Sequence, residues 1–329
     1  MLASLVARVP IAFLPTPIME MNRLSQELGG PRIFVTLDDQ TGLATGGNKA
    51  RKLEFLIADA LAQGADTVLT VGGPQSNHAR QTAAAAAMYG LRSVLILTGS
   101  APSEWNGNLL LDDLLGAEVR WAGDDPWDEV MREVAEEVER AGHRPYAIPL
   151  GGSTSVGATG YVAAMEELML QLDELDVQVD AIILPTGSGG TQAGMLVGAK
   201  ALGFEGRIVG ISVAADGNTM RGILRELVPG TAESLGLNVA VEDSDLLVYD
   251  DYLGEGYGVL GDPEREAIRL VARLEAILLD PVYTGRAMAG FLHLIEQGVF
   301  GSGQNILFWH TGGTSGLFAY AEGLMKRRG

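Results

Sequence analysis

Residues 181–194 read Ala-Ile-Ile-Leu-Pro-Thr-Gly-Ser-Gly-Gly-Thr-Gln-Ala-Gly, an apolar run that leads into a glycine-rich turn. The run is typical of a buried strand, and the residues after the turn are typical of the start of a helix. Successive N–H groups in such a turn can surround an anion, and the dipole of the following helix adds to the attraction. The glycine spacing matches neither the Walker loop nor the dinucleotide-binding pattern, so the turn predicts a site for a single phosphate group.

Short apolar runs of this kind alternate with helical patterns along most of the chain. The strands predicted from them cover residues 32–37, 67–71, 93–97, 118–121, 146–150, 181–184, 208–213, 246–249 and 305–309. Helices are expected between most of these strands, and glycines such as Gly64 and Gly203 mark their ends. The alternation predicts an α/β fold with two doubly wound, mainly parallel sheets that have helices on both faces. A chain of 329 residues is long enough for two such domains.

The composition excludes several classes of function. The formal net charge of -19 argues against nucleic acid and anionic membrane surfaces as partners, because both attract basic proteins. Cysteine is absent and the four histidines are scattered, so neither disulfides nor a metal site is expected. No apolar run approaches the ~20 residues that a membrane-spanning helix needs, and the start of the chain lacks a signal-peptide pattern. A cytoplasmic location is therefore expected.

A basic segment stands at the start of a predicted helix. Residues 46–52 read Gly-Gly-Asn-Lys-Ala-Arg-Lys, and the apolar residues after them have helical spacing. A lysine at such a junction, here Lys49, can lie beside a pocket, where loss of solvent lowers the pKa of its amine. Only a neutral amine attacks a carbonyl carbon, so the position suits a covalent role. Taken alone, the segment is more typical of solvated charges before a surface helix.

Two other predicted strands also end in polar turns. Residues 72–78, Gly-Gly-Pro-Gln-Ser-Asn-His, precede an alanine-rich helix whose first N–H groups attract a carboxylate or a phosphate. Residues 306–316 form the other strand and turn, and Tyr257 and Tyr283 lie in turns upstream of it. Each phenol can act as an acid or a base, although packing is the commoner role of a tyrosine in a turn.

These parts together predict an enzyme that uses pyridoxal 5'-phosphate on amino acids. The aldehyde of this cofactor needs a lysine, its phosphate needs an anion site, and the substrate carboxylate needs a third anchor. Over residues 15–320 the chain resembles the fold-type II pyridoxal-phosphate family that includes D-cysteine desulfhydrase and 1-aminocyclopropane-1-carboxylate deaminase. The stretches that carry the resemblance are residues 42–49, 75–78, 280–285 and 310–313.

The resemblance implies a tryptophan synthase β-like fold, with a large cofactor-binding domain of residues 1–52 and 162–329 and a small domain of residues 53–161. It also implies a homodimer, a small amino-acid substrate, and catalytic roles for Lys49, which forms the Schiff base, and for Ser76, Tyr257 and Tyr283. The cofactor would be bound by Asn77 at its ring hydroxyl, by Thr311 at its ring nitrogen, and at its phosphate by Gly187, Ser188, Gly189, Gly190 and Thr191. Lys49 and Thr186 complete the cofactor-binding residues that the resemblance implies. The substrate-binding residues that the resemblance implies are Ser76, Asn77, His78, Tyr257, Tyr283 and Thr284.

Two positions indicate the substrate. The similar cyclopropane deaminases carry Glu after the tyrosine and Leu before the double glycine, where this chain has Thr284 and Thr311. A threonine leaves the ring nitrogen of the cofactor largely neutral, which suffices to expel a good leaving group. The resemblance therefore implies α,β-elimination of D-cysteine to pyruvate, hydrogen sulfide and ammonia.

Several alternatives stay open. L-Cysteate sulfo-lyase and 1-aminocyclopropane-1-carboxylate deaminase are alternatives within the family, and a non-catalytic cytosolic sensor of a phosphorylated metabolite is an alternative of another class. The chain also departs from the family pattern in two places. Arg286 stands where we expect a lysine, and residues 314–316 lack the Pro-Ala-Leu pattern of the similar enzymes.

Overall fold

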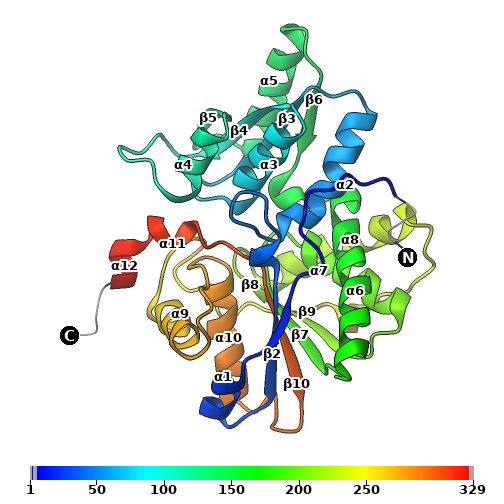
Figure 1. Ribbon diagram of the computed structural model, residues 1–329. Coiled ribbons are helices and arrows are strands. Elements are labelled where there is room, and N and C mark those ends of the chain that lie inside the picture. Colours follow the sequence, from blue (N-terminus) through cyan, green and yellow to red (C-terminus); the bar gives the residue numbers. More distant parts are fainter. Residues whose placement is uncertain (1, 3–5, 326–329) are drawn as a thin grey trace.

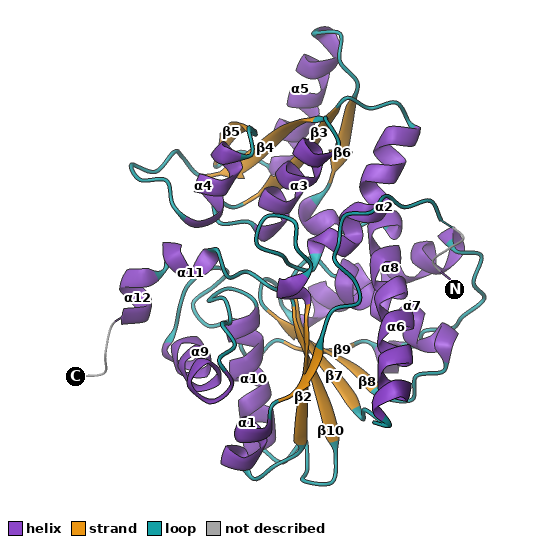
Figure 2. Cartoon of the chain, in the orientation of Figure 1, coloured by secondary structure: helices purple, strands orange, loops and turns teal. Residues whose placement is uncertain are grey.

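The computed structural model describes residue 2 and residues 6–325, and two β-sheets organise this part of the chain (Figures 1 and 2). The larger sheet has the strand order β1-β2-β10-β7-β8-β9, and the smaller has the order β5-β4-β3-β6. All neighbouring strands are parallel except β1 and β2. The strands are β1 Ile18–Glu20, β2 Arg32–Leu37, β3 Thr67–Gly72, β4 Arg92–Thr98, β5 Glu118–Gly123, β6 Pro145–Ile148, β7 Ala181–Thr186, β8 Arg207–Ser212, β9 Leu247–Tyr249 and β10 Asn305–His310.

The helices connect these strands and cover both sheets. They are α1 Asn22–Leu28, α2 Lys49–Ala62, α3 Asn77–Met88, α4 Gly107–Leu114, α5 Trp127–Arg140, α6 Ser155–Leu175, α7 Gly190–Leu202, α8 Gly217–Ser234, α9 Asp262–Glu275, α10 Thr284–Glu296, α11 Gly316–Ala319 and α12 Ala321–Met325. In the described part of the chain, no helix is both long enough and apolar enough to cross a membrane.

The predicted strands are all present, and each lies within two residues of its predicted bounds. The antiparallel edge strand β1 was not predicted, because its three residues, Ile-Met-Glu, are too short to show a pattern. The sequence Asp125-Pro126 predicts a helix with Asp125 as its cap and Pro126 as its first residue, but α5 begins one residue later, at Trp127. In the structure Pro126 has extended backbone angles and caps the helix instead.

Each sheet has helices on both faces, so the predicted doubly wound α/β fold is confirmed. One face of the larger sheet packs against α6, α7 and α8, and the other packs against α1, α9 and α10. In β7, Ile182 and Leu184 join the first core, whereas Ala181 and Ile183 join the second. Because successive side chains of a strand point to opposite faces, burial of both faces requires the continuous apolar run seen in the sequence. The smaller sheet is covered by α5 on one face and by α2, α3 and α4 on the other.

A buried ionic network joins α2 to the larger sheet. Asp38, at the end of β2, accepts hydrogen bonds from Arg51 Nε at 2.8 Å, from Trp309 Nε1 at 2.7 Å and from the hydroxyl of Tyr161. The Arg51 guanidinium also binds Glu167 on α6, with Nη2–Oε1 at 2.8 Å. Arg51 is 2% exposed, so this residue of the basic segment is a structural ion-pair partner and not a solvated charge.

The proposed division into a large and a small domain is consistent with the two sheets, because β3 to β6 all come from residues 67–148. Its boundaries stay a prediction. The first falls inside α2 and the second inside α6, and both helices continue through the boundary and pack against each other.

Candidate active site

A cavity of about 280 Å³ lies where the carboxyl ends of β3, β7 and β10 meet. Ligands bind at such an edge in open α/β sheets. Most of the predicted site residues line it, namely Lys49, Ser76, Asn77, His78, Thr186, Gly187, Ser188, Gly189, Thr191, Tyr257, Tyr283 and Thr311. Sequence reasoning did not identify the other lining residues, which are Asn48, Gly73, Trp127, Leu150, Gly151, Pro185 and Ala214.

Lys49 is the first residue of α2, and its side chain reaches the cavity. Lys49 is partly exposed at the cavity, and burial of its amine by the surrounding protein lowers its pKa to about 8. The turn before it depends on glycine. A Cβ at Gly46 would lie 1.8 Å from the carbonyl oxygen of Asp39, and one at Gly47 would lie 2.5 Å from Gln81 Nε2. The two glycines therefore let the chain pass close to its neighbours and deliver the lysine to the cavity.

The glycine-rich turn after β7 leads into α7, whose first residue is Gly190. The N–H of Gly190 donates to Ser153 Oγ at 3.1 Å, and Ser153 Oγ donates to Ser188 Oγ at 2.8 Å. Gly189 caps the helix with φ of 79°, a left-handed conformation that glycine adopts without strain. N–H groups and hydroxyls thus gather at a helix start, which is the arrangement that binds phosphate.

Lys52 adds a cation to this turn. Its Nζ donates to the carbonyl oxygen of Gly151 at 3.1 Å and to Ser153 Oγ at 3.3 Å, and a Cβ at Gly190 would lie 2.9 Å from it. The side chain is 1% exposed, and among the described residues no carboxylate pairs with it. Burial and the charge of Lys49 lower the pKa of Lys52 well below its usual value. A bound dianion would favour its charged form, so the donor set fits a phosphate.

Ser76 and His78 lie at the start of α3. Ser76 caps the helix and accepts the N–H of Ala79 at 3.1 Å, which leaves its own hydrogen free to donate into the cavity. The Thr70 hydroxyl donates to the carbonyl oxygen of Ile148 at 2.8 Å, so the Nε2 of His78, 2.9 Å away, must be the donor to Thr70. His78 Nδ1 then carries a lone pair, and this buried atom has no partner among the described residues. Burial lowers the pKa of His78, which keeps the ring neutral.

Tyr257 and Tyr283 form a pair that lines the cavity. Their hydroxyl oxygens are 2.6 Å apart, and their rings meet edge to face at an interplanar angle of 75°. Although Tyr257 is 47% exposed, its hydroxyl turns inward to Tyr283. Burial raises the pKa of both phenols, so both hold their protons at neutral pH. Only one hydrogen can lie between the two oxygens, so the other remains available to a ligand.

Thr284 and Gly190 do not line the cavity. The Thr284 hydroxyl donates to Asp280 Oδ1 at 2.7 Å, and the same carboxylate accepts the N–H groups of Val282, Tyr283 and Thr284. Asp280 thereby fixes the start of α10 and the backbone of Tyr283, whereas Thr284 serves this turn and not the cavity. Gly190 is the first residue of α7, and its N–H donates to Ser153 Oγ, so it supports the glycine-rich turn from outside the cavity lining.

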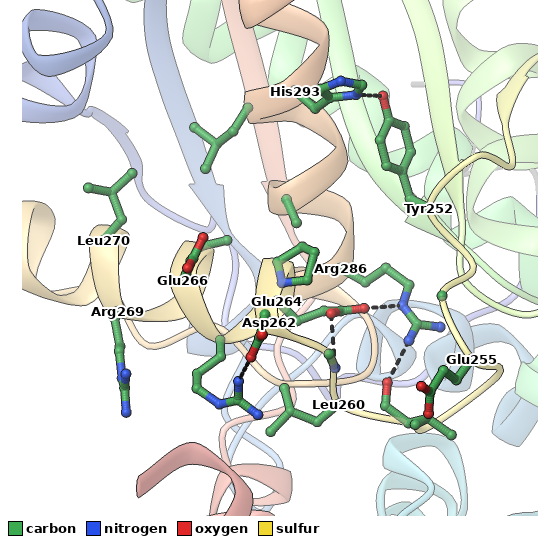
Figure 3. Close-up of a pocket in the computed structure, with 18 of the residues that line it drawn as sticks. Tyr252, Glu255, Leu260, Asp262, Glu264, Glu266, Arg269, Leu270, Arg286 and His293 are labelled. Atoms are coloured by element: carbon green, nitrogen blue, oxygen red, sulfur yellow. Dashed lines mark hydrogen bonds and ion pairs between the residues drawn. The ribbon is translucent and has the colours of Figure 1, made fainter. Parts of the chain in front are cut away.

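Arg286 explains one departure from the family pattern. Figure 3 shows it beside a broader surface hollow of about 1110 Å³, paired with Glu264. Arg286 Nε donates to Glu264 Oε1 at 2.7 Å, Nη1 to the carbonyl oxygen of Gly256 at 2.9 Å, and Nη2 to that of Val259 at 2.7 Å. The planar guanidinium thus fixes the loop that carries Tyr257, which one ammonium group could not do in the same geometry. The hollow itself contains no predicted site residue, so the smaller cavity is the candidate site.

No group of three or more His, Asp or Glu side chains within residues 6–325 could hold a metal ion.

Comparisons with known proteins identify the relatives of the chain. A family model described as “Pyridoxal-phosphate dependent enzyme” matches residues 9–312. A Pyrococcus abyssi (strain GE5 / Orsay) protein named “Putative 1-aminocyclopropane-1-carboxylate deaminase” is 42% identical over 332 residues, covering 98% of this chain and 97% of the relative.

Solved structures agree with this similarity. A crystal structure of a protein described as an ACC deaminase homologue has a TM-score of 0.91 and 41% sequence identity, covering 98% of this chain and 97% of that one. Threonine deaminase isoform 2 of Solanum lycopersicum has a TM-score of 0.68 at 18% identity, covering 95% of this chain and 83% of the other, and so shares the fold.

Proposed function

The chain belongs to the pyridoxal-phosphate dependent enzyme family, and we propose that it eliminates hydrogen sulfide from D-cysteine. Membership confirms the resemblance seen in the sequence, with pyridoxal 5'-phosphate as the cofactor and elimination or deamination as the chemistry. In the proposed reaction, D-cysteine and water give pyruvate, hydrogen sulfide and ammonia. A non-catalytic sensor has no support from these relatives.

The donor set of the cavity fits the cofactor. Lys49 offers a buried amine of lowered pKa, which is the group that an aldehyde requires. The turn from Gly187 to Thr191, together with Lys52, offers hydroxyls, N–H groups and a cation to the phosphate. Asn77 and Thr311 are assigned to the ring hydroxyl and the ring nitrogen by resemblance, and both line the cavity. When bound, the cofactor withdraws the electron pair that remains after a proton leaves the substrate Cα.

The side chains of the site have distinct proposed roles. Lys49 Nζ removes the Cα proton, since its lowered pKa leaves a useful fraction of the amine neutral near pH 8. The Ser76 hydroxyl and the first N–H groups of α3 hold the substrate carboxylate. The ring of His78 presents a lone pair, which repels a carboxylate, so its contribution is the backbone N–H. The protonated pair of Tyr257 and Tyr283 supplies a proton to the leaving sulfur.

One observation carries the choice of sulfur elimination: no carboxylate is among the residues that line the cavity. A carboxylate beside the ring nitrogen would keep it protonated, as the demanding opening of a cyclopropane requires. Here Thr311 lines the cavity, and Asp280 is occupied by Thr284 and by backbone N–H groups. A neutral ring suffices for expulsion of hydrosulfide, which is a good leaving group.

Two rival substrates remain. The name of the Pyrococcus abyssi relative favours 1-aminocyclopropane-1-carboxylate, whose deamination would release 2-oxobutyrate. L-Cysteate carries a sulfonate that needs a further cation, and Lys49 is the only lysine or arginine among the residues that line the cavity. The lining therefore favours D-cysteine over L-cysteate.

A substrate comparison tests the proposal. D-cysteine, L-cysteine, L-cysteate and 1-aminocyclopropane-1-carboxylate are supplied in turn to the purified, cofactor-loaded protein, and pyruvate, sulfide and 2-oxobutyrate are measured. We expect equimolar pyruvate and sulfide from D-cysteine with the highest kcat/KM of the four. Faster release of 2-oxobutyrate from the cyclopropane acid would reject the proposal in favour of the deaminase. Lys49→Ala should abolish both the visible absorption of the bound cofactor and turnover.

Three further expectations belong to this proposal. We propose that the protein is a homodimer, that the small domain of residues 53–161 closes over the substrate, and that the protein acts in the cytoplasm. Sedimentation equilibrium measures the first, and small-angle scattering with and without substrate measures the second. Fluorescence microscopy of a tagged chain tests the third.

A further inference from the structure

Asn108, the second residue of α4, connects three segments around the cavity. It is fully buried, although it does not line the cavity itself. Its Oδ1 accepts Arg80 Nε at 3.1 Å and the Ser315 hydroxyl at 2.6 Å. Its Nδ2 donates to the carbonyl oxygen of Gln75 and to Asn77 Oδ1, both at 2.8 Å. Each hydrogen-bonding atom of the Asn108 side chain is therefore used.

The orientation of two amides follows from these partners. An arginine can only donate and a backbone carbonyl can only accept, so the oxygen of Asn108 must face Arg80 and its nitrogen must face Gln75. Because that nitrogen also faces Asn77, the nearer atom of Asn77 must be its oxygen. The nitrogen of Asn77 therefore points the other way, and a Cβ built on Gly313 would lie 2.9 Å from it. Asn77 itself lines the cavity, and among the described residues its side chain is hydrogen-bonded only through Oδ1, so its nitrogen is a donor available on the cavity side.

Arg80 gives this arrangement a rigid anchor. Its Nη1 donates to the carbonyl oxygens of Ala44 and Gly46, at 2.6 and 2.9 Å, in the turn that precedes Lys49. The guanidinium is thereby held from two sides and cannot turn to release Asn108. One buried arginine thus fixes both the turn that delivers Lys49 and the amide next to Asn77.

We propose that Asn108 is a positioning residue that holds the Asn77 amide with its nitrogen toward the cavity, ready to donate to the ring oxygen of the cofactor. The inference rests on the proposed assignment of Asn77 to that oxygen. With the opposite orientation, Asn77 would present its carbonyl oxygen to an ionised ring oxygen, and the two would repel. Among the described residues, Asn108 is the hydrogen-bond partner of the Asn77 side chain, so the choice of orientation comes from Asn108.

Asn108→Asp tests the proposal, because it keeps the shape and replaces only the donating end. One carboxylate oxygen still accepts from Arg80 and Ser315, but the other repels Asn77 Oδ1, so the Asn77 amide turns over. A donor to the ring oxygen favours its ionised form, so loss of that donor raises the pKa of the bound chromophore. Loss of this charge-assisted hydrogen bond should raise the chromophore pKa by about one to two units, and it should weaken cofactor affinity by about 10-fold to 100-fold. Spectrophotometric pH titration and fluorescence titration with pyridoxal 5'-phosphate measure the two effects.

Two comparisons separate positioning from other causes. Ser315→Ala removes a bond to the same oxygen of Asn108 but leaves its bond to Asn77, so the chromophore pKa should stay unchanged. In an Asn77→Ala background, Asn108→Asp should no longer change that pKa, because the residue acts through Asn77. If the Asn108→Asp protein does not fold, Asn108→Ala replaces it and should raise the pKa by a smaller amount.

The outcomes are distinct. An unchanged chromophore pKa and affinity in the Asn108 variants, with a normal visible band in the wild-type protein, would overturn the positioning role and leave the proposed function intact. An equal shift in Ser315→Ala, or a shift that persists without the Asn77 side chain, would also overturn it. A wild-type protein that binds no cofactor would overturn both proposals.

Discussion

The lowered pKa of Lys49 makes a quantitative prediction for cofactor binding. The free amine must attack the aldehyde, so the rate of attachment depends on the neutral fraction of Lys49. With a pKa of about 8, about one amine in ten is neutral at pH 7. A solvent-exposed lysine with a pKa of ~10.4 has about one in 2,500. Burial therefore gives Lys49 an advantage of about 200-fold at pH 7 in the concentration of the reactive form.

The sign of the pH dependence follows from this fraction. Below pH 8 the rate of attachment should rise about tenfold per pH unit, and above pH 8 it should level off, because nearly every Lys49 amine is then neutral. The assay mixes cofactor-free protein with pyridoxal 5'-phosphate in a stopped-flow instrument and follows the visible absorption band between pH 6 and 10. Nα-acetyl-lysine amide, treated identically, corrects for pH effects on the cofactor itself. Lys49→Arg protein should give no band.

A particular result would refute the reasoning. If the rate for the protein keeps rising to pH 10 in parallel with that for the free lysine derivative, the amine is solvated and burial does not control its reactivity. If the rate is independent of pH from pH 6 upward, the pKa lies far lower than burial alone explains. In that case a cation near Lys49, of which Lys52 is the nearest candidate, would have to contribute.

Three other changes have definite expected outcomes. Gly190→Ala should weaken cofactor binding in a fluorescence titration, because the new Cβ would lie 2.9 Å from the Lys52 amine. Gly222→Ala is the control: a Cβ at residue 222 would have no atom within 4 Å, so cofactor binding should not change. Asp38→Asn should lower the free energy of unfolding in urea by about 1.5–3 kcal/mol, because it removes one of the two carboxylates that pair with the buried Arg51, and an unchanged midpoint would contradict this. Arg286→Lys should lower kcat with D-cysteine, on the order of 100-fold, with a small change in KM, because the loop that carries Tyr257 loses its fixed geometry. Equal kcat values would show that the loop holds its position without the guanidinium.

The fold could be predicted because its sheets are buried on both faces. A strand such as β7 must then be apolar at every position, and this continuous run is visible without knowledge of its neighbours. The antiparallel strand β1 gave no such signal, since it is three residues long and lies at the edge of the sheet. Helix starts were less certain than strands, because Pro126 can serve either as a cap or as a first helical residue.

Much of the site could also be predicted, because the carboxyl ends of β3 in the smaller sheet and of β7 and β10 in the larger sheet meet at the cavity and bring their turns together. The sequence could not show which of several neighbouring groups a side chain forms its hydrogen bonds with. Thr284 follows a tyrosine that lines the cavity, yet its hydroxyl donates to Asp280, four residues earlier, and does not reach the cavity. Ser153 lies between β6 and α6, and its Oγ accepts the N–H of Gly190 in the glycine-rich turn after β7. No pattern in the sequence connects these two residues.

Helix geometry determines the different surroundings of the three basic residues Lys49, Arg51 and Lys52. Residues 49, 51 and 52 lie in the first turn of α2, and a helix turns by about 100° per residue. Lys52 is thus only about 60° from Lys49, whereas Arg51 is about 160° away. Both lysines face the cavity side, while Arg51 faces Asp38 and Glu167 and is neutralised there. The two amines have no carboxylate to pair with in the described part of the chain, so a bound phosphate is the group that would favour the charged form of Lys52 in this acidic protein.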